Sequence, residues 1–366
     1  MNVSKPYILI AVLAVIAGAI YVISINSVRK TGSSKPVTVV PRTSSQQYEI
    51  RKEEKSKRYE LAKEITTPDG FLNTEGKPIT VSELAGKKVI LVDFWTYSCI
   101  NCQRTTPYLN AWYEKYKDKG FVIIGVHTPE FEFEKDYNNV KAAIEKLGIR
   151  FPVVLDNDYS TWTAYKNRYW PHKYLIDIDG YIVYDHIGEG AYTDTEKKIQ
   201  ELLREREETL GMNEEINNEI SQPIEIRGVD SSLPRSPEIY FGAARNTALG
   251  NGQAHTIGIQ NLSEPEDSKT NTLYLSGDWN FQDESAENKS THAKIIFRYK
   301  AKNVYFVAGS ENSTKIKIFN DGTFIREEVI NEHKLYHVIQ DTEYGEHTLE
   351  IIIENPGLRA FTFTFG

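Results

Sequence analysis

Residues 92–102 read VDFWTYSCINC, and they hold both cysteines of the chain, Cys99 and Cys102. The apolar run 89–95 is typical of a buried strand, and the residues after Cys99 repeat apolar side chains at helical spacing. The pattern predicts a strand, a short turn and a helix that starts near Cys99. The positive end of a helix dipole stabilises a thiolate, so Cys99 is the expected attacking sulfur. Cys102, one turn further along, is expected to resolve the mixed disulfide by thiol exchange.

Two cysteines among 366 residues exclude several other classes of protein. A fold held together by disulfides needs more cysteines spread along the chain, and a four-ligand zinc site needs two further ligands. We therefore expect no metal and no cofactor other than a redox-active disulfide between Cys99 and Cys102. The net charge of −8, with no basic stripe, argues against a nucleic-acid partner.

An alternation of apolar runs and helical patterns surrounds the two cysteines and predicts an α/β domain over residues 63–205. Asp179-Gly180 is a two-residue hairpin signal between its last two strands, and residues 193–196 fit a capping box for a closing helix. Residues 130–134 alternate glutamate with phenylalanine and are predicted to form a solvated loop, with a place at the rim of the active-site cleft as the alternative. Further expected elements are strands at 121–126, 151–155, 174–176 and 181–184 and helices at 138–147 and 160–167.

The rest of the chain carries only β signals after a linker at residues 206–237. We expect a β-sandwich of the jelly-roll, carbohydrate-module-like type over residues 238–366, with hairpins at 320–322 and 355–357. The predicted strands are 272–275, 294–299, 304–308, 315–319, 334–338, 348–353 and 360–365.

Residues 7–25 form an uncharged apolar run close to the roughly 20 residues that cross a bilayer. They predict a membrane anchor within residues 1–30, followed by a tether and polar helix over 31–62; a cleaved signal peptide is the alternative. Arg29 and Lys30 after the span would favour a cytoplasmic body, but long domains translocate largely regardless of charge. A single-pass protein of the cell membrane with its dithiol outside the cytoplasm is the expectation.

The motif VDFWTYSCINC resembles the active site of the thioredoxin superfamily, and residues 170–172, Trp-Pro-His, resemble its cis-proline segment. The resemblance implies that Asp93 is the partly buried carboxylate that helps to deprotonate Cys102. It also implies that Pro171 is the cis-proline beside the dithiol, where a substrate polypeptide pairs with the backbone. Trp95, Trp170 and His172 flank these motifs and are the expected substrate-binding residues.

Residues 63–203 as a whole are similar to redoxin proteins of the TlpA and ResA type. They are most similar to the thioredoxin-like portion of DipZ-type proteins, which a carbohydrate-module-like β domain follows. The resemblance implies a thiol:disulfide oxidoreductase that acts on protein thiols and disulfides. DipZ-type proteins also carry a multi-span electron-transfer domain of the CcdA kind. This chain has one predicted span, so a separate CcdA-like membrane donor is expected.

Two alternatives stay open. Thr96 and Cys99 match the second half of a peroxiredoxin site, although Val92 stands where that site has proline and Cys102 favours exchange. The β domain could instead be the working part, binding envelope glycans or a protein, with the dithiol subsidiary; Trp279 is its one tryptophan. Ile100-Asn101 between the cysteines leaves the direction of electron flow open.

Overall fold

The computed structural model describes residues 44–223, 233 and 235–366. The predicted anchor at residues 7–25 lies outside these ranges. Within them, no helix is both long enough and apolar enough to cross a membrane. The polar helix predicted within residues 31–62 is α2 (Ser44–Ser56).

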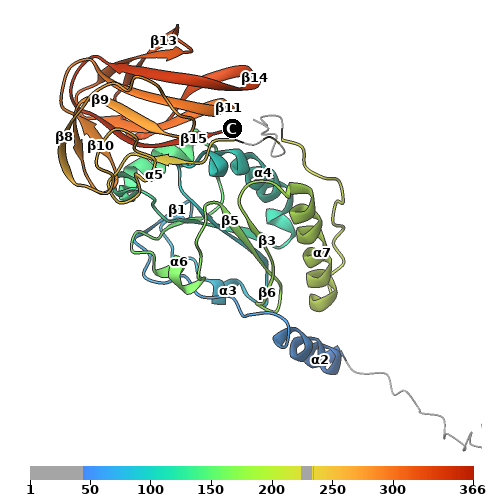
Figure 1. The fold of residues 1–366 in the computed structure, drawn as a ribbon. Coiled ribbons are helices and arrows are strands. Elements are labelled where there is room, and N and C mark those ends of the chain that lie inside the picture. Colours follow the sequence, from blue (N-terminus) through green and yellow to red (C-terminus); the bar gives the residue numbers. More distant parts are fainter. Residues whose placement is uncertain (1–43, 224–232, 234) are drawn as a thin grey trace, which may run out of the picture. The chain divides into compact units, whose positions relative to one another are not determined.

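The α/β domain is built on a six-stranded sheet with the order β1-β4-β3-β2-β5-β6 (Figure 1). Central strand β2 runs parallel to β3 and antiparallel to β5. The strands are β1 (Gly70–Leu72), β2 (Val89–Trp95), β3 (Phe121–His127), β4 (Val153–Leu155), β5 (His172–Ile176) and β6 (Ile182–Ile187). The helices are α3 (Val81–Leu84), α4 (Ile100–Tyr116), α5 (Tyr137–Lys146), α6 (Ser160–Ala164) and α7 (Tyr192–Leu210), with short 3-10 helices η1 (Lys117–Lys119) and η2 (Glu132–Lys135).

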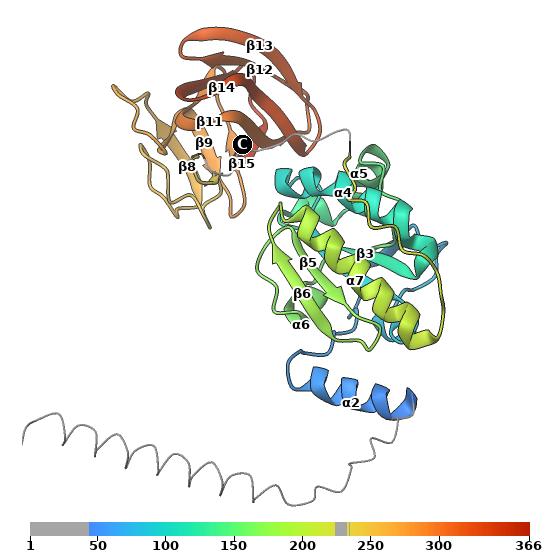
Figure 2. The same cartoon turned by 90° about the vertical axis from the view of Figure 1, so that its right-hand side faces the viewer.

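Strand β2 is buried on both faces, which explains its unbroken apolar run. Val89 and Leu91 pack in one cluster with Leu109 and Trp112 of α4 and with side chains of α7. Ile90 and its alternate neighbours pack on the other face with residues of α3. Figure 2 shows α4 and α7 on one side of the sheet. The end of β2 is thereby fixed between two layers of helices, and the turn that follows it holds Cys99.

Two local predictions for this domain are wrong. The capping box at residues 193–196 does not form, because α7 begins at Tyr192 after Ala191, which has a left-handed backbone. The Glu196 side chain instead accepts bonds from Lys115, Tyr116 and Ser221. The second wrong prediction is the length of one turn. Strands β5 and β6 do pair as the predicted hairpin, but their connection spans residues 177–181 rather than two residues; Gly180 within it has a positive φ of 87°, which favours glycine.

The first part of the predicted linker packs on the α/β domain. Helix α7 continues to Leu210, and Ile216 belongs to the same apolar cluster as α4 and α7. The Glu207 carboxylate accepts the Glu214 N–H at 2.9 Å. Charged residues that look like linker in sequence are therefore bonded to the helix they follow.

The C-terminal β domain is a nine-stranded sheet with the path β13-β12-β14-β11-β15-β10-β9-β8, and β7 pairs with β15. Its longest strands are β11 (Ala293–Ser310) and β14 (Lys334–Ile353), each predicted as two separate strands. Their pairing continues through register shifts near Asn303, where the polar residues interrupt the apolar pattern but not the ladder. The others are β7 (Ile239–Tyr240), β8 (Gly258–Leu262), β9 (Leu273–Phe281), β10 (Ala286–Asn288), β12 (Thr314–Asn320), β13 (Thr323–Ile330) and β15 (Leu358–Phe365).

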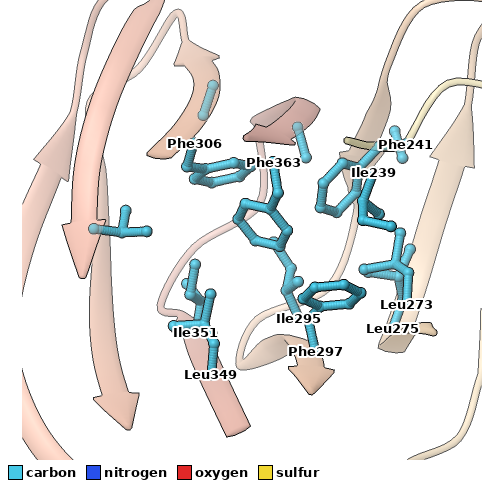
Figure 3. Packing of buried hydrophobic residues seen from close by; sticks show 14 of the residues in the cluster. Ile239, Phe241, Leu273, Leu275, Ile295, Phe297, Phe306, Leu349, Ile351 and Phe363 are labelled. Atoms are coloured by element: carbon cyan, nitrogen blue, oxygen red, sulfur yellow. The ribbon is translucent and has the colours of Figure 1, made fainter. Parts of the chain in front are cut away.

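Inward side chains of these strands form one large apolar core. Figure 3 shows Phe306, Phe363 and Phe297 close together within it, between aliphatic side chains of neighbouring strands. Trp279 is fully buried in the same core, so the one tryptophan of this domain cannot form a sugar-binding platform at the surface. The jelly-roll assignment stays a prediction.

The two predicted hairpins of this domain have different outcomes. Strands β12 and β13 pair from Asn320 opposite Thr323, and Asp321 and Gly322 both have positive φ, so the first hairpin is confirmed. The second, at residues 355–357, is wrong. It connects β14 to β15, but β11 lies between these strands in the sheet.

Candidate active site

Cys99 is the N-cap residue of α4, in the turn that directly follows β2. Its Sγ accepts the Cys102 N–H at 3.4 Å, the kind of bond that stabilises a thiolate at a helix N-terminus. Cys99 is half-buried, whereas Cys102 is 2% exposed. Burial, followed by the neighbouring Cys99, raises the pKa of the Cys102 thiol. The accessible sulfur is therefore Cys99, and the enclosed Cys102 needs a base to become reactive.

Asp93 lies buried in the middle of β2 and is the carboxyl group that acts electrostatically on Cys102. Burial raises its pKa to about 7, and the charge of Lys173 partly offsets that rise. Lys173 is directly opposite Asp93 in the β2–β5 ladder. It is fully buried and donates to the Gly188 carbonyl at 3.0 Å. A carboxyl group that titrates near neutral pH can take a proton from a thiol and return it.

The peptide bond between Trp170 and Pro171 is cis, as predicted. Cys99 Sγ lies 3.9 Å from the Trp170 carbonyl oxygen, so the predicted cis-proline segment borders the accessible sulfur. The Trp170 indole N–H donates to the Thr128 carbonyl at 2.9 Å, and its ring packs 4.3 Å from that of Trp162. These contacts hold the segment beside α4.

A cleft of about 480 Å³ opens in front of Cys99. Within residues 52–366, which form one compact unit, both domains line it. The α/β domain contributes Cys99, Asn101, Glu130 and Trp170, among others, and the residues from 235 onward contribute Arg235, Glu238, Tyr240, Arg245 and Phe365, among others. Any molecule that reaches Cys99 from this cleft passes side chains of the β domain.

Comparison with known proteins agrees with this geometry. Residues 60–203 match the family described as Redoxin, and residues 236–366 match the one described as Thioredoxin like C-terminal domain. The thiol-disulfide oxidoreductase YkuV of Bacillus subtilis is 30% identical over 144 residues, which are 39% of this chain and 95% of that protein. ResA of Bacillus cereus, also a thiol-disulfide oxidoreductase, is 35% identical over 128 residues, 35% of this chain and 70% of that protein.

The chain belongs to the thioredoxin-like thiol-disulfide oxidoreductases. The protein DipZ of Mycobacterium tuberculosis is 38% identical over 310 residues, 82% of this chain. The chain spans 43% of the length of that relative. The similarity to DipZ thus extends beyond the α/β domain into the β domain.

Two of the substrate-binding residues predicted for this oxidoreductase do not reach the cleft. Trp95 is 3% exposed, and its ring packs against His127 at 5.1 Å. His172 is 6% exposed, and its ring nitrogens bond to Asn167 at 2.6 Å and Asp185 at 3.0 Å. Both side chains are buried inside the domain, Trp95 in the same apolar cluster as Cys102, so nearness to the motif in the sequence does not bring them to the cleft. Trp170 is the predicted substrate-binding residue that does line the cleft.

Sequence reasoning missed Lys173 and Glu134. The signal for Lys173 is a lysine inside a five-residue strand whose residues are all buried, because a buried lysine needs a partner. The prediction of a solvated loop at residues 130–134 is wrong, since the Glu134 carboxyl is fully buried. The signal for Glu134 is the pair Phe131 and Phe133, two large apolar side chains just before it, which indicate that this segment packs against something.

One acidic cluster in the described residues has spacing suited to a metal: Asp177, Asp179 and Glu205. The Lys55 ammonium lies among these carboxylates, 2.6 Å from Asp177 and 2.8 Å from Asp179. The lysine supplies the positive charge that an ion would otherwise bring.

Replacing Lys173 by methionine is expected to raise the pKa of Asp93 above its value of about 7, because the Lys173 charge lowers it. Methionine is unbranched and uncharged and only one atom shorter than lysine, so it fills most of the buried space that Lys173 occupies. Carboxyl-carbon NMR of Asp93 against pH measures the shift directly. If the pKa of Asp93 is the same in Lys173→Met and in the wild-type protein, Lys173 does not lie beside Asp93 in solution.

Proposed function

We propose that this oxidoreductase is anchored in the cell membrane and reduces protein disulfides outside the cytoplasm through Cys99 and Cys102. The observation that carries the proposal is the pairing of a half-exposed Cys99 at the helix N-terminus with a buried Cys102 one turn along. This asymmetry supports one sulfur that meets the substrate and one that meets only Cys99.

In the proposed first step, the Cys99 thiolate attacks one sulfur of a substrate disulfide. The substrate S–S bond breaks, a substrate thiolate leaves, and Cys99 is joined to the other substrate sulfur. In the second step, Cys102 gives its proton to Asp93 and attacks Cys99, which releases the second substrate thiolate. The Cys99–Cys102 pair has then lost two electrons, and the substrate disulfide has gained them.

The buried carboxyl of Asp93 suits the second step because its pKa is raised to about 7. Near that pH the group spends time in both forms, so it can take up the proton of Cys102 and later return it. Asp93 is thus proposed to exchange a proton with one atom, the Cys102 sulfur. The backbone beside cis-Pro171 and the Trp170 side chain are proposed to receive the substrate polypeptide.

The protein must be reduced again after each turnover. A membrane protein of the CcdA kind is the proposed donor, as the resemblance to DipZ-type proteins implies. Labelling of intact cells with a thiol reagent that cannot cross membranes tests the location. Cys99 should react in intact cells, and reaction only after lysis would contradict an extracytoplasmic site.

The reduction potential of the Cys99–Cys102 pair tests the direction of electron flow. The fragment that starts at residue 52 contains both domains as one compact unit and can be equilibrated with glutathione buffers. A value near roughly −270 mV is expected for a reductant, and one near roughly −120 mV would indicate an oxidant. Cys99→Ser is the control that removes the disulfide.

A further inference from the structure

The segment of residues 129–135, which we name the strap, connects the turn at Cys99 with the β domain. On one side of it, Glu134 Oε1 accepts the Ser98 hydroxyl at 2.5 Å and the Ser98 N–H at 3.3 Å. Glu134 Oε2 accepts the N–H groups of Glu130 at 2.6 Å and Phe131 at 3.0 Å. A fully buried carboxyl group thus bonds to the residue directly before Cys99 and to the strap itself.

The other side of the strap packs on the β domain. The Phe131 and Phe133 rings lie 5.1 and 4.9 Å from the ring of Phe361 in β15. Phe131 and Phe361 belong with Val307 to a buried cluster separate from the main cores of both domains. Rings at these separations add stabilisation beyond their buried area.

Polar contacts from the β domain hold the same segment. Glu130 Oε1 lies 2.8 Å from Arg245 and accepts the Tyr240 hydroxyl at 3.1 Å. The Glu132 N–H donates to the Glu284 carboxylate at 2.9 Å. The β domain therefore contacts the strap through an apolar cluster, an ion pair, a side-chain hydrogen bond and one bond from a strap backbone N–H.

We propose that Glu134 is a positioning residue of the dithiol, and that the β domain holds it in place through the strap and so adjusts the redox equilibrium of Cys99 and Cys102. This inference rests on the proposed function of the two cysteines. It gives the β domain a task that does not require a ligand of its own.

The charge on Glu134 determines in which direction the redox equilibrium of the dithiol is expected to shift. Burial raises the pKa of Glu134, while its bonds to Ser98, Thr96 and the strap favour the ionised form. Both oxygens accept bonds from donors of the Ser98 turn and of the strap, and these bonds stabilise the carboxylate form. In its ionised form, the Glu134 carboxylate beside Cys99 disfavours a second negative charge on that sulfur, and therefore the reduced state, because a buried site is screened less than water would screen it.

Glu134→Gln tests whether Glu134 affects the redox equilibrium of Cys99 and Cys102. Glutamine keeps the shape of the side chain and removes its charge, and its NH2 group replaces one of the two oxygens that accept bonds. The equilibrium constant with glutathione is expected to shift about tenfold toward the reduced dithiol, which is about 30 mV for a two-electron pair. Alkylation of Cys99 should also extend to lower pH. The role of Glu134 is refuted if the folded variant shows the wild-type equilibrium constant and alkylation profile.

Phe361→Ala tests whether the β domain acts on the dithiol through the strap, because Phe361 lies outside the α/β domain. Loss of its ring loosens the strap, and the equilibrium constant is expected to shift in the same direction by about threefold. Phe324→Ala is the matched control, since Phe324 is exposed on β13 and its ring packs on Phe319 rather than on the strap. Thermal melting confirms that each variant is folded.

The outcomes separate the two proposals. If wild-type Cys99 and Cys102 form no reversible disulfide, the proposed function fails, and this inference fails with it. If the wild-type protein forms a reversible Cys99–Cys102 disulfide and Phe361→Ala has the same equilibrium constant with glutathione as Phe324→Ala, the proposed function stands. The coupling of the dithiol to the β domain is then refuted. A shift in Glu134→Gln and Phe361→Ala, with none in Phe324→Ala, supports it.

Discussion

Cys99→Ser is expected to lose disulfide reductase activity by about a thousandfold or more, because serine cannot form the sulfur–sulfur bond on which every later step depends. Cys102 cannot substitute for it. Cys102 is 2% exposed, and burial raises the pKa of its thiol. Turnover of a disulfide-bonded peptide at saturating donor measures the loss. Residual activity within tenfold of wild type would show that the buried sulfur meets substrate directly.

Cys102→Ser is expected to fail at a different step. Cys99 still attacks the substrate, but no second thiol releases it, so the mixed disulfide accumulates. Non-reducing electrophoresis and intact mass should show one substrate half per protein molecule, removable by dithiothreitol. The variant with both substitutions, Cys99→Ser and Cys102→Ser, is the control and should trap nothing. Equal trapping by Cys99→Ser and Cys102→Ser would contradict the assignment of roles.

The sequence predicts the dithiol turn well because its determinants are local. An unbroken apolar run needs burial on both faces, and residues of β2 do pack on both sides of the sheet. Helical periodicity after Cys99 then places that residue at the N-terminus of α4. Each step uses residues that are neighbours in the chain, so no knowledge of distant contacts is needed.

The surroundings of the dithiol depend on distant contacts. Lys173 faces Asp93 across two strands, and nothing near either residue in the chain indicates that pairing. Glu134 looks solvent-exposed in a run of charged residues until the contacts of Ser98 and Phe361 are known. The same holds for the capping box at residues 193–196, where Glu196 bonds to Ser221 and Lys115 instead of to its own helix.

In the β domain, strand positions are predictable and strand partners are not. The apolar alternation marks both halves of β11, but it cannot show that the ladder continues past Asn303. Residues 355–357 have the composition of a hairpin turn, yet the strands they connect are separated by β11. The composition of a turn shows that the chain reverses there. Which strands then pair depends on which apolar faces meet in the core.

Asp93→Asn is expected to stabilise the protein at pH 8 and much less at pH 5. The pKa of Asp93 is about 7 in the folded protein, above the value near 4 of an unfolded chain. Between these values the folded state keeps a proton that the unfolded state has released, so stability falls as pH rises from about 4 to about 7. Above about pH 7 the whole cost of ionising the buried carboxyl is present. Asparagine carries no such cost.

The size of the effect follows from the same difference in pKa. A shift of about three units corresponds to about 4 kcal/mol as an upper limit, and the isolated Lys173 charge in the variant reduces it to about 2 kcal/mol. Urea unfolding at pH 5 and pH 8 measures it. Asp118→Asn is the matched control, because Asp118 is exposed on η1. A gain at pH 8 no larger than that at pH 5 would mean that Asp93 is not the group titrating near 7.

The same substitution is expected to slow the second chemical step. Without the Asp93 carboxylate, Cys102 loses its proposed proton acceptor, and general bases typically contribute about a hundredfold or more. The mixed disulfide at Cys99 should therefore persist longer in Asp93→Asn, while the rate of its formation changes little. Rapid acid quenching at pH 8 resolves the two rates. A variant that is more stable but slower in this one step would show that the protein keeps a destabilising buried carboxyl because Cys102 needs it, and equal lifetimes in variant and wild type would remove Asp93 from the mechanism.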